Sequence, residues 1–241
     1  MRIVFRVSRY DPEKDREPQF REYEVSAAPE DRVLDGLVQI KDTIDGSLGF
    51  RRSCAHGVCG SDGMVINGKE RLACKTLVRD VAKQDGDVVT LEPLRHMRVE
   101  RDLMVDQEEF FRKYRDAKPY FVAEESVPAE RERVQSPAER EAFEDPTACI
   151  LCASCYSACP VLDSNGRFVG PAAIVQAARF NFDSRDAGFA ERLPALDHPD
   201  GAWACENHFQ CTRVCPRGIK VTKNINLTKR MIEKRTGRGK S

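Results

Sequence analysis

Two cysteine-rich stretches determine how this chain folds. The first reads CILCASCYSACP over residues 149–160, and the second reads CENHFQCTRVCP over residues 205–216. Both follow the spacing C-x2-C-x2-C-x3-C-P, except that His208 occupies the place of the second cysteine in the second stretch. The sequence between them does not repeat, so the pattern is local and does not indicate a solenoid.

This spacing is that of bacterial ferredoxins with two iron–sulfur clusters. In those proteins three cysteines of one run bind one cluster, and the cysteine before proline binds the other. The same rule predicts a [4Fe–4S] cluster on four thiolates: Cys149, Cys152, Cys155 and Cys215. Only three thiolates remain for the second cluster, so we predict a [3Fe–4S] centre on the other cysteines: Cys159, Cys205 and Cys211.

A third ligand set lies before residue 75. Its spacing is C-x4-C-x2-D-x11-C, close to the plant-type [2Fe–2S] pattern, with a carboxylate in the third place. A carboxylate is a harder ligand than a thiolate but can bind iron. The predicted ligands are Cys54, Cys59, Asp62 and Cys74. Three glycines in this loop let the backbone fold closely around the sulfides and offer amide N–H groups: Gly57, Gly60 and Gly63.

Composition excludes several classes of protein. Lysine and arginine (39) balance aspartate and glutamate (39), so no overall field favours nucleic acid. No apolar run is long enough to span a bilayer, and the N-terminal MRIVF begins as a strand rather than as a signal peptide. We expect a soluble or peripheral protein of a bacterial or archaeal cytoplasm. Disulfides and structural zinc are weaker alternatives, because the cluster patterns use each of the ten cysteines once.

Residues 1–105 are predicted to form an α+β unit. Alternating residues indicate strands at 2–9, 19–25 and 88–91, and Asn67-Gly68 indicates a hairpin between 64–66 and 70–73. Helical spacing of apolar residues over 33–44 predicts one helix, with Asp31 as its N-cap. A sheet packed on one helix with a cluster loop at its edge is the arrangement of a β-grasp ferredoxin domain.

Residues 106–241 are predicted to form an all-α, ferredoxin-like domain. Helices are expected over 108–115, from the capping box Ser136-Pro137-Ala138-Glu139, after Gly170-Pro171 and over 221–233. No strand is expected after Leu91. The predicted fold class is therefore α+β, with two domains at 1–105 and 106–241.

These features resemble the iron–sulfur subunit of succinate dehydrogenase and fumarate reductase. The resemblance covers nearly the whole chain and extends beyond the cysteines to Arg95, FVGPA at 168–172 and DSRD at 183–186. It implies that electrons pass one at a time from the FAD of a partner flavoprotein through [2Fe–2S], [4Fe–4S] and [3Fe–4S] to a quinone, or in reverse. No side chain of this subunit is then needed for catalysis on the dicarboxylate.

The resemblance also implies partners and a location. The partners are a flavoprotein with covalent FAD, a membrane-anchor subunit or pair with or without haem b, and a quinone, but no nucleic acid. The location is the cytoplasmic face of the bacterial plasma membrane, reached through the anchor. The direction of the reaction, the anchor type and the oligomeric state stay open at this stage.

The resemblance implies a quinone site near the third cluster, at Pro160, His208 and Lys229. Three interpretations of His208 stay open: an iron ligand, a hydrogen-bond or proton partner of quinone, or an ordinary packed or exposed residue. Lys229 is either a quinone-pocket lysine or an exposed helical lysine. In the family that this chain resembles, many ubiquinone-type members carry a tryptophan shortly after this Cys-Pro. None follows Cys159-Pro160 closely here, so the resemblance favours menaquinone over ubiquinone.

Two other functions remain as alternatives. The chain could be the iron–sulfur subunit of another membrane dehydrogenase, although those lack the β-grasp domain with its Asp62 ligand. It could also be a soluble multi-cluster carrier, which would behave well as a monomer without partners. A zinc-binding structural or sensing module is a third class, and it would lack a visible-range chromophore.

Overall fold

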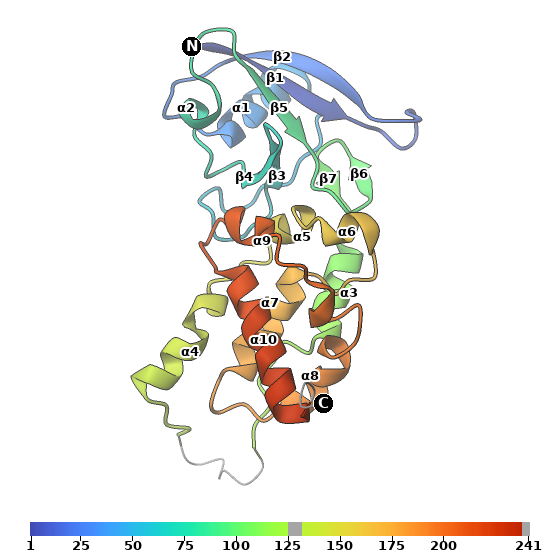
Figure 1. Cartoon of the computed structure of the whole chain (residues 1–241). Helices are drawn as coiled ribbons and strands as arrows, with labels where there is room; N and C mark the ends of the chain where they lie inside the picture. Colours follow the sequence, from blue (N-terminus) through green and yellow to red (C-terminus); the bar gives the residue numbers. More distant parts are fainter. Residues whose placement is uncertain (125–131, 238–241) are drawn as a thin grey trace. The chain divides into compact units, whose positions relative to one another are not determined.

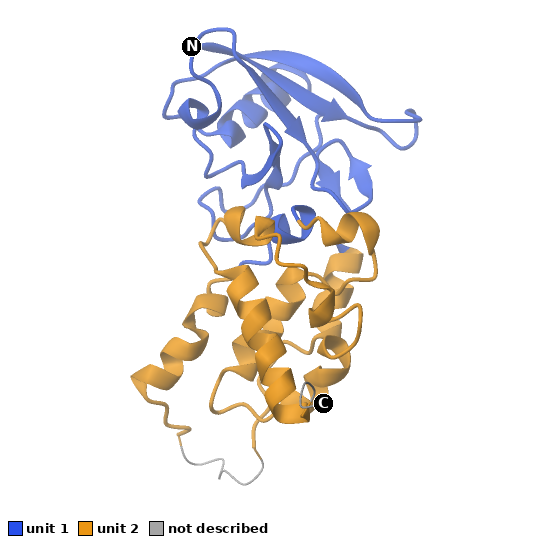
Figure 2. Cartoon of the chain, viewed as in Figure 1, with its two compact units in different colours: residues 1–107, 150–158 blue, residues 108–149, 159–241 orange. Residues whose placement is uncertain are grey.

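A computed structural model describes residues 1–124 and 132–237. The chain divides into two compact units (Figure 2): residues 1–107 with 150–158, and residues 108–149 with 159–241. Residues 150–158, which carry Cys152 and Cys155, therefore group with the first unit, although the sequence prediction placed them in the second domain.

The first unit is built on a five-stranded sheet with the strand order β2-β1-β5-β3-β4 (Figure 1). The strands are β1 (Arg2–Arg9), β2 (Gln19–Ser26), β3 (Gly63–Ile66), β4 (Lys69–Leu72) and β5 (Val88–Glu92). β1 pairs with β2 in antiparallel and with β5 in parallel orientation, and β3 is antiparallel to both of its neighbours. This topology confirms the predicted α+β class with an N-terminal β-grasp domain.

The helix of this unit packs closely on the sheet. α1 (Val33–Gln39) continues into a π-helical turn, η1 (Ile40–Ile44), and a short α2 (Val78–Val81) follows later. A Cβ atom at Gly36 would meet the Phe5 ring at 2.7 Å, so only glycine allows this approach. The predicted N-cap was wrong: Asp31 accepts the Ala28 N–H at 2.7 Å, and α1 begins after Arg32.

A second prediction was also wrong, because strands do occur after Leu91. β6 (Val99–Arg101) and β7 (Met104–Val105) form a two-stranded antiparallel sheet. They are too short for an alternating pattern to reveal them. The turn between them is held by the buried Asp102 carboxylate, which accepts from Arg9 Nε at 2.9 Å and from Gly49 N at 2.7 Å.

The second unit consists of helices around α7 (Pro171–Asn181). The others are α3 (Glu108–Asp116), α4 (Pro137–Thr147), α6 (Val161–Ser164), α8 (Phe189–Leu196), η2 (Ala202–Ala204), α9 (Gln210–Arg213) and α10 (Val221–Thr236). α7 contacts α3, α4, α8 and α10. Its sequence, PAAIVQAARFN, is mostly apolar around the whole helix, so it is buried on nearly all sides. The predicted capping box before α4 is confirmed, with the Ser136 N–H donating to Glu139 Oε2 at 2.8 Å.

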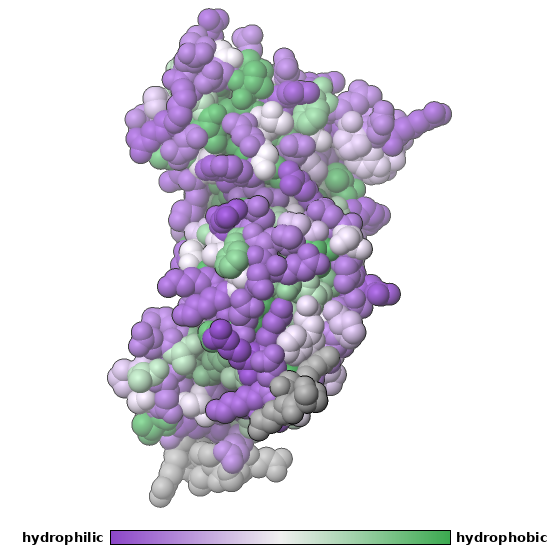
Figure 3. All heavy atoms as spheres, viewed as in Figure 1, coloured by the Kyte–Doolittle hydropathy of each residue, from purple (hydrophilic) through white to green (hydrophobic). Residues whose placement is uncertain are grey.

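The surface of the chain is mostly polar. Figure 3 shows hydrophilic residues over most of the visible face of both units. Among the residues that the structure describes, we find no helix with the length and apolar character needed to cross a bilayer.

One buried ion pair links separate segments of the second unit. The Arg192 side chain on α8 is fully buried, and its two Nη atoms lie 2.6 and 2.9 Å from the Asp186 carboxylate oxygens. Arg192 Nε also donates to the Lys118 carbonyl at 2.9 Å. This guanidinium therefore fixes α8 to the segment that follows α3.

Replacing Arg192 tests how much this pair contributes. Arg192→Met should lower the free energy of unfolding by about 3–5 kcal/mol, because it leaves the buried Asp186 carboxylate without its partner. The control is Arg112→Met, which breaks an exposed ion pair with Asp116 and should cost at most about 1 kcal/mol. Urea unfolding of the full chain, followed by circular dichroism, measures both. Equal losses in the two variants would contradict the assignment.

Candidate metal centres

The first candidate centre is the loop that precedes β3. Gly57 and Gly60 adopt positive φ values of 78° and 71°, which turn the backbone around Cys54. Cys54 Sγ accepts the N–H of Cys59 at 3.3 Å and that of His56 at 3.5 Å. The backbone amides of His56, Cys59 and Val58 lower the pKa of the Cys54 thiol to about 6. The loop is therefore prepared to hold a thiolate, which is the form that binds iron.

Asp62 supplies a buried oxygen that has no hydrogen-bond partner among the residues that the structure describes. Its side chain is buried, with 3 % of the residue exposed, and Oδ2 accepts the Cys74 N–H at 2.5 Å. Oδ1 is buried and has no hydrogen-bond partner among the described residues. Buried carboxylate oxygens are normally paired, so this atom is suited to bind a cation. Burial and the adjacent Asp62 raise the pKa of Cys74 to about 12, and a bound iron would remove both penalties.

The same loop packs directly on the backbone that carries part of the second centre. A Cβ atom at Gly60 would lie 2.8 Å from Cys152 Cβ and 3.0 Å from Cys152 Cα. A Cβ atom at Gly63 would lie 2.9 Å from the Cys152 carbonyl oxygen. Glycine is therefore required at both positions. The sequence predicted close backbone approach at these glycines, but not that Cys152 is the group they approach.

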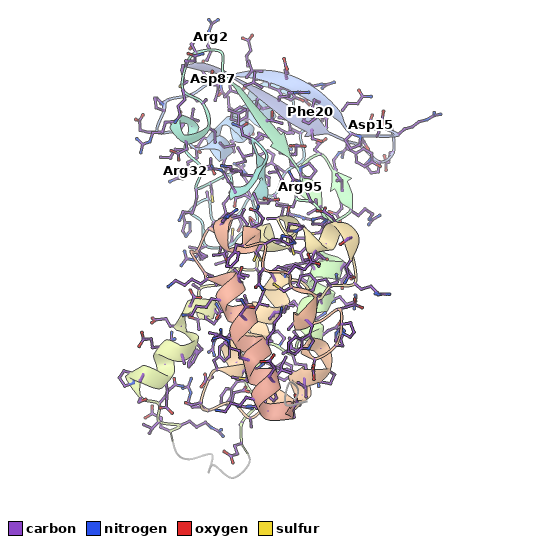
Figure 4. All side chains as sticks on the ribbon, in the orientation of Figure 1. Arg2, Asp15, Phe20, Arg32, Asp87 and Arg95 are labelled. Carbon is purple, nitrogen blue, oxygen red and sulfur yellow. The ribbon has the colours of Figure 1, made fainter. Side chains whose placement is uncertain are left out.

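Hydrogen bonds hold this second segment against the sheet. α5 (Ser154–Ser157) ends at Ser157, whose hydroxyl donates to the buried Glu70 Oε1 on β4 at 2.9 Å. The backbone N–H of Arg95, which Figure 4 labels, donates to the same Ser157 oxygen at 2.8 Å. Cys152 and Cys155 thus belong to the unit that carries the first loop. The other two predicted ligands of that cluster, Cys149 and Cys215, belong to the second unit.

The third candidate centre lies within the second unit. One pocket is lined by all three predicted ligands, Cys159, Cys205 and Cys211. Its other lining residues are both apolar and polar: Pro160, Val161, Phe168, Pro171, Phe209, Ile225, Glu206, Asn207, His208, Gln210 and Thr222. Burial raises the pKa of Cys159 to about 11, with Cys211 and Cys205 adding to the shift. Burial also raises the pKa of Cys211. Positive iron at this place would stabilise thiolates that burial alone disfavours.

The residues predicted for a quinone site differ in their surroundings. Pro160 and His208 line the pocket of the third centre. The His208 side chain is 45 % exposed, and its Nε2 lies 3.0 Å from the Glu206 carboxylate. Lys229 Nζ donates to the Cys205 carbonyl at 2.8 Å, so this lysine supports the loop that carries Cys205.

Further polar residues in the second unit escaped sequence analysis. Asp145 accepts from the backbone N–H of Lys220 at 3.1 Å and from Asn224 Nδ2 at 2.7 Å. It therefore ties the stretch before Cys149 to the stretch after Cys215 within this unit. No spacing rule identifies it, because the contact joins residues 75 or more positions apart.

In the parts of the chain that the structure describes, no three His, Cys, Asp or Glu side chains converge closely enough to hold one metal ion. A cluster of several irons separates its thiolates, so its ligands need not meet at a point. The ligand sets themselves stay predictions, which the experiments below test.

Comparisons with known proteins agree with this geometry. Residues 4–112 match the family described as a 2Fe-2S iron-sulfur cluster binding domain, and residues 145–219 match the 4Fe-4S dicluster domain. The fumarate reductase iron-sulfur subunit of Mycobacterium tuberculosis is 48% identical over 90% of this chain and 87% of the relative. The succinate dehydrogenase iron-sulfur subunit of Coxiella burnetii is 40% identical over 92% of this chain and 94% of the relative.

Solved structures give the same result. A chain of the Mycobacterium smegmatis Sdh1 complex in the apo form matches with a TM-score of 0.85 at 27% identity, covering 99% of this chain and 98% of that one. Fold and family matches together define a multi-cluster iron–sulfur protein. The chain belongs to the family of succinate dehydrogenase and fumarate reductase iron–sulfur subunits. The resemblance stated from the sequence is thereby confirmed.

The packing at Gly60 generates the first prediction for the sites. Gly60→Ala should cost about 1–2 kcal/mol for its positive φ and a further 1–3 kcal/mol for the overlap with Cys152. It should also lower the iron content of the purified chain. Gly68→Ala is the matched control, because Gly68 has a φ of 76° but no atom within 4 Å of the added Cβ. Equal losses of unfolding free energy and of iron in both variants would contradict a specific role for the Gly60–Cys152 contact.

The unpartnered Asp62 oxygen generates the second prediction. Asp62→Ala should lose most of the EPR signal of a reduced [2Fe–2S] cluster, because one iron then lacks a ligand. Asp62→Cys restores four thiolates and should keep the cluster with altered g values. EPR spectra of the two reduced variants, with matched iron assays, make the comparison. A full, unaltered signal in Asp62→Ala would exclude Asp62 as a ligand.

Proposed function

We propose that this chain is the electron-transfer subunit of a succinate:quinone oxidoreductase. The clusters, when bound, supply one-electron carriers between the two-electron chemistry of a flavin and that of a quinone. The first cluster is assigned to Cys54, Cys59, Asp62 and Cys74, and the second to Cys149, Cys152, Cys155 and Cys215. The third, a [3Fe–4S] centre, is assigned to Cys159, Cys205 and Cys211.

The contact of Gly60 with Cys152 is the observation that carries this proposal. Residues proposed as ligands of two different clusters then lie in one packed unit, with Gly60 directly against Cys152. Electron transfer between centres requires a fixed and short separation. A structural protein would not need two cluster loops in such close contact.

Partners follow from the family and from exposed apolar residues. The proposed partners are an FAD-containing flavoprotein and a membrane anchor, with or without haem b, which would hold the chain at the cytoplasmic face of the plasma membrane. Val58 lies exposed beside Cys59 in the first loop, a suitable contact for the flavoprotein. Phe209 is exposed beside the third centre, a suitable contact for the anchor.

A quinone, with menaquinone favoured, is proposed to bind at the third centre. Pro160 and His208 line the pocket there, and Lys229 holds the backbone of Cys205. The Nε2 atom of His208 lies 3.0 Å from a Glu206 carboxylate oxygen, so this nitrogen has a partner other than iron. This geometry favours a role for His208 at the quinone and not as an iron ligand.

Assays of electron delivery distinguish the proposed roles of Cys205 and His208. The complex is purified anaerobically through a tag on this chain and supplied with succinate. Cys205→Ser should abolish quinone reduction by disrupting the third cluster, while an artificial acceptor that takes electrons from the flavin is still reduced. His208→Ala should keep the iron content of the wild type and slow quinone reduction.

Each alternative predicts a different result. A chain that purifies without partners and reduces soluble acceptors would support a soluble carrier instead. Loss of iron in His208→Ala equal to the loss in Cys205→Ser would make His208 a ligand. Wild-type complex whose visible absorbance neither bleaches with succinate nor, once chemically reduced, recovers with fumarate would overturn the proposed function.

A further inference from the structure

A pair of threonines lies against one of the predicted ligands of the third centre. Thr222 is in the first turn of α10 and is 1 % exposed. Its Oγ1 lies 3.4 Å from Cys211 Sγ and 3.0 Å from Thr212 Oγ1. The backbone N–H of Thr222 donates to Thr212 Oγ1 at 3.0 Å. The two hydroxyls therefore form a short chain that starts at a helix N–H and ends at a sulfur.

The direction of this chain is fixed once Cys211 binds iron. An iron-bound cysteine is a thiolate, so its sulfur can only accept a hydrogen bond. Thr222 must then donate its hydroxyl proton to Cys211 Sγ. Thr212 Oγ1 already accepts the Thr222 N–H, and its own proton is free to point to Thr222 Oγ1. Each hydroxyl thus accepts one hydrogen bond and donates one.

We propose that Thr222 is a positioning residue that raises the reduction potential of the third cluster through its hydrogen bond to Cys211. This inference rests on the proposed function, since it requires a cluster at Cys159, Cys205 and Cys211. Reduction adds an electron to the cluster and increases the negative charge on its sulfurs. A hydrogen bond to a ligand sulfur therefore stabilises the reduced state more than the oxidised state.

The surroundings strengthen this effect. Thr222 and Cys211 are both buried, and a hydrogen bond to a charged sulfur is stronger where water is excluded. The hydrogen-bond chain begins at the Thr222 N–H. This group lies in the first turn of a 16-residue helix, where the aligned peptide dipoles are positive. A higher potential at the last cluster favours electron transfer to it from the two clusters before it.

Helix α10 also offers a matched control for Thr222. Thr228 on α10 is fully buried, and its hydroxyl donates to the Asn224 carbonyl at 2.9 Å, a common bond within helices. Replacing either threonine by valine keeps the shape and removes a buried hydroxyl. Only the change at residue 222 removes a bond to a cysteine sulfur. Thr222→Ser keeps the hydroxyl and serves as the rescue.

The experiment is a redox titration of the intact complex, following the EPR signal of the oxidised third cluster. Thr222→Val should shift its midpoint to lower potential, so that the equilibrium constant for its reduction falls roughly two- to tenfold. Thr222→Ser and Thr228→Val should titrate like the wild type. The midpoint of the [2Fe–2S] cluster should not move in any of these variants.

Thr212→Val provides a second test if Thr222→Val fails to bind the cluster. This change removes the hydroxyl that precedes Thr222 in the hydrogen-bond chain. The midpoint potential should therefore shift in the same direction, but by less. A retained signal at the wild-type midpoint in both valine variants would overturn the inference alone. An equal shift in Thr228→Val would also overturn it, by showing a general packing effect. If the wild-type complex has no such signal, the proposed third cluster is overturned and the inference with it.

Discussion

The close packing of the 54–63 loop on the backbone of Cys152 is the constraint on which the other features depend. It requires glycine at residues 60 and 63, because a Cβ atom at either position would overlap the Cys152 residue. It also explains why residues 150–158 group with the sheet instead of with the helices that surround them in sequence. A chain that relays electrons needs its carriers at fixed separations, and backbone packing fixes them more firmly than side chains could.

The pKa values of the cysteine thiols differ between the first loop and the third centre. At the first loop, backbone amides lower the pKa of Cys54 to about 6, so the thiolate is stable before any metal arrives. At the third centre, burial raises the pKa of Cys159 to about 11, so the thiolate depends on the positive charge of iron. His56, Val58 and Cys59 of the first loop are exposed, whereas Cys159 and Cys211 of the third centre are buried.

Much of this could be predicted from sequence because the informative signals are local. Cysteine spacing, the Asn67-Gly68 hairpin and the Ser136 capping box all act within a few residues, and each corresponds to an observed feature or family match. The rest depends on contacts between residues far apart in sequence. The Arg192 ion pair reaches residues 118 and 186, and the bond from Thr222 to Cys211 joins two helices. No spacing rule encodes such pairs, and the short strands β6 and β7 likewise depend on the distant Asp102 contacts.

The most direct test of the account is an iron assay combined with EPR on the oxidised, anaerobically purified complex. The account predicts about nine irons per chain and a near-isotropic signal from an oxidised [3Fe–4S] centre. That result would mean that the place of His208 holds no fourth iron and that the cysteine sets are complete without it. About ten irons with no signal in the oxidised sample would contradict the account, because a second [4Fe–4S] cluster would then end the relay.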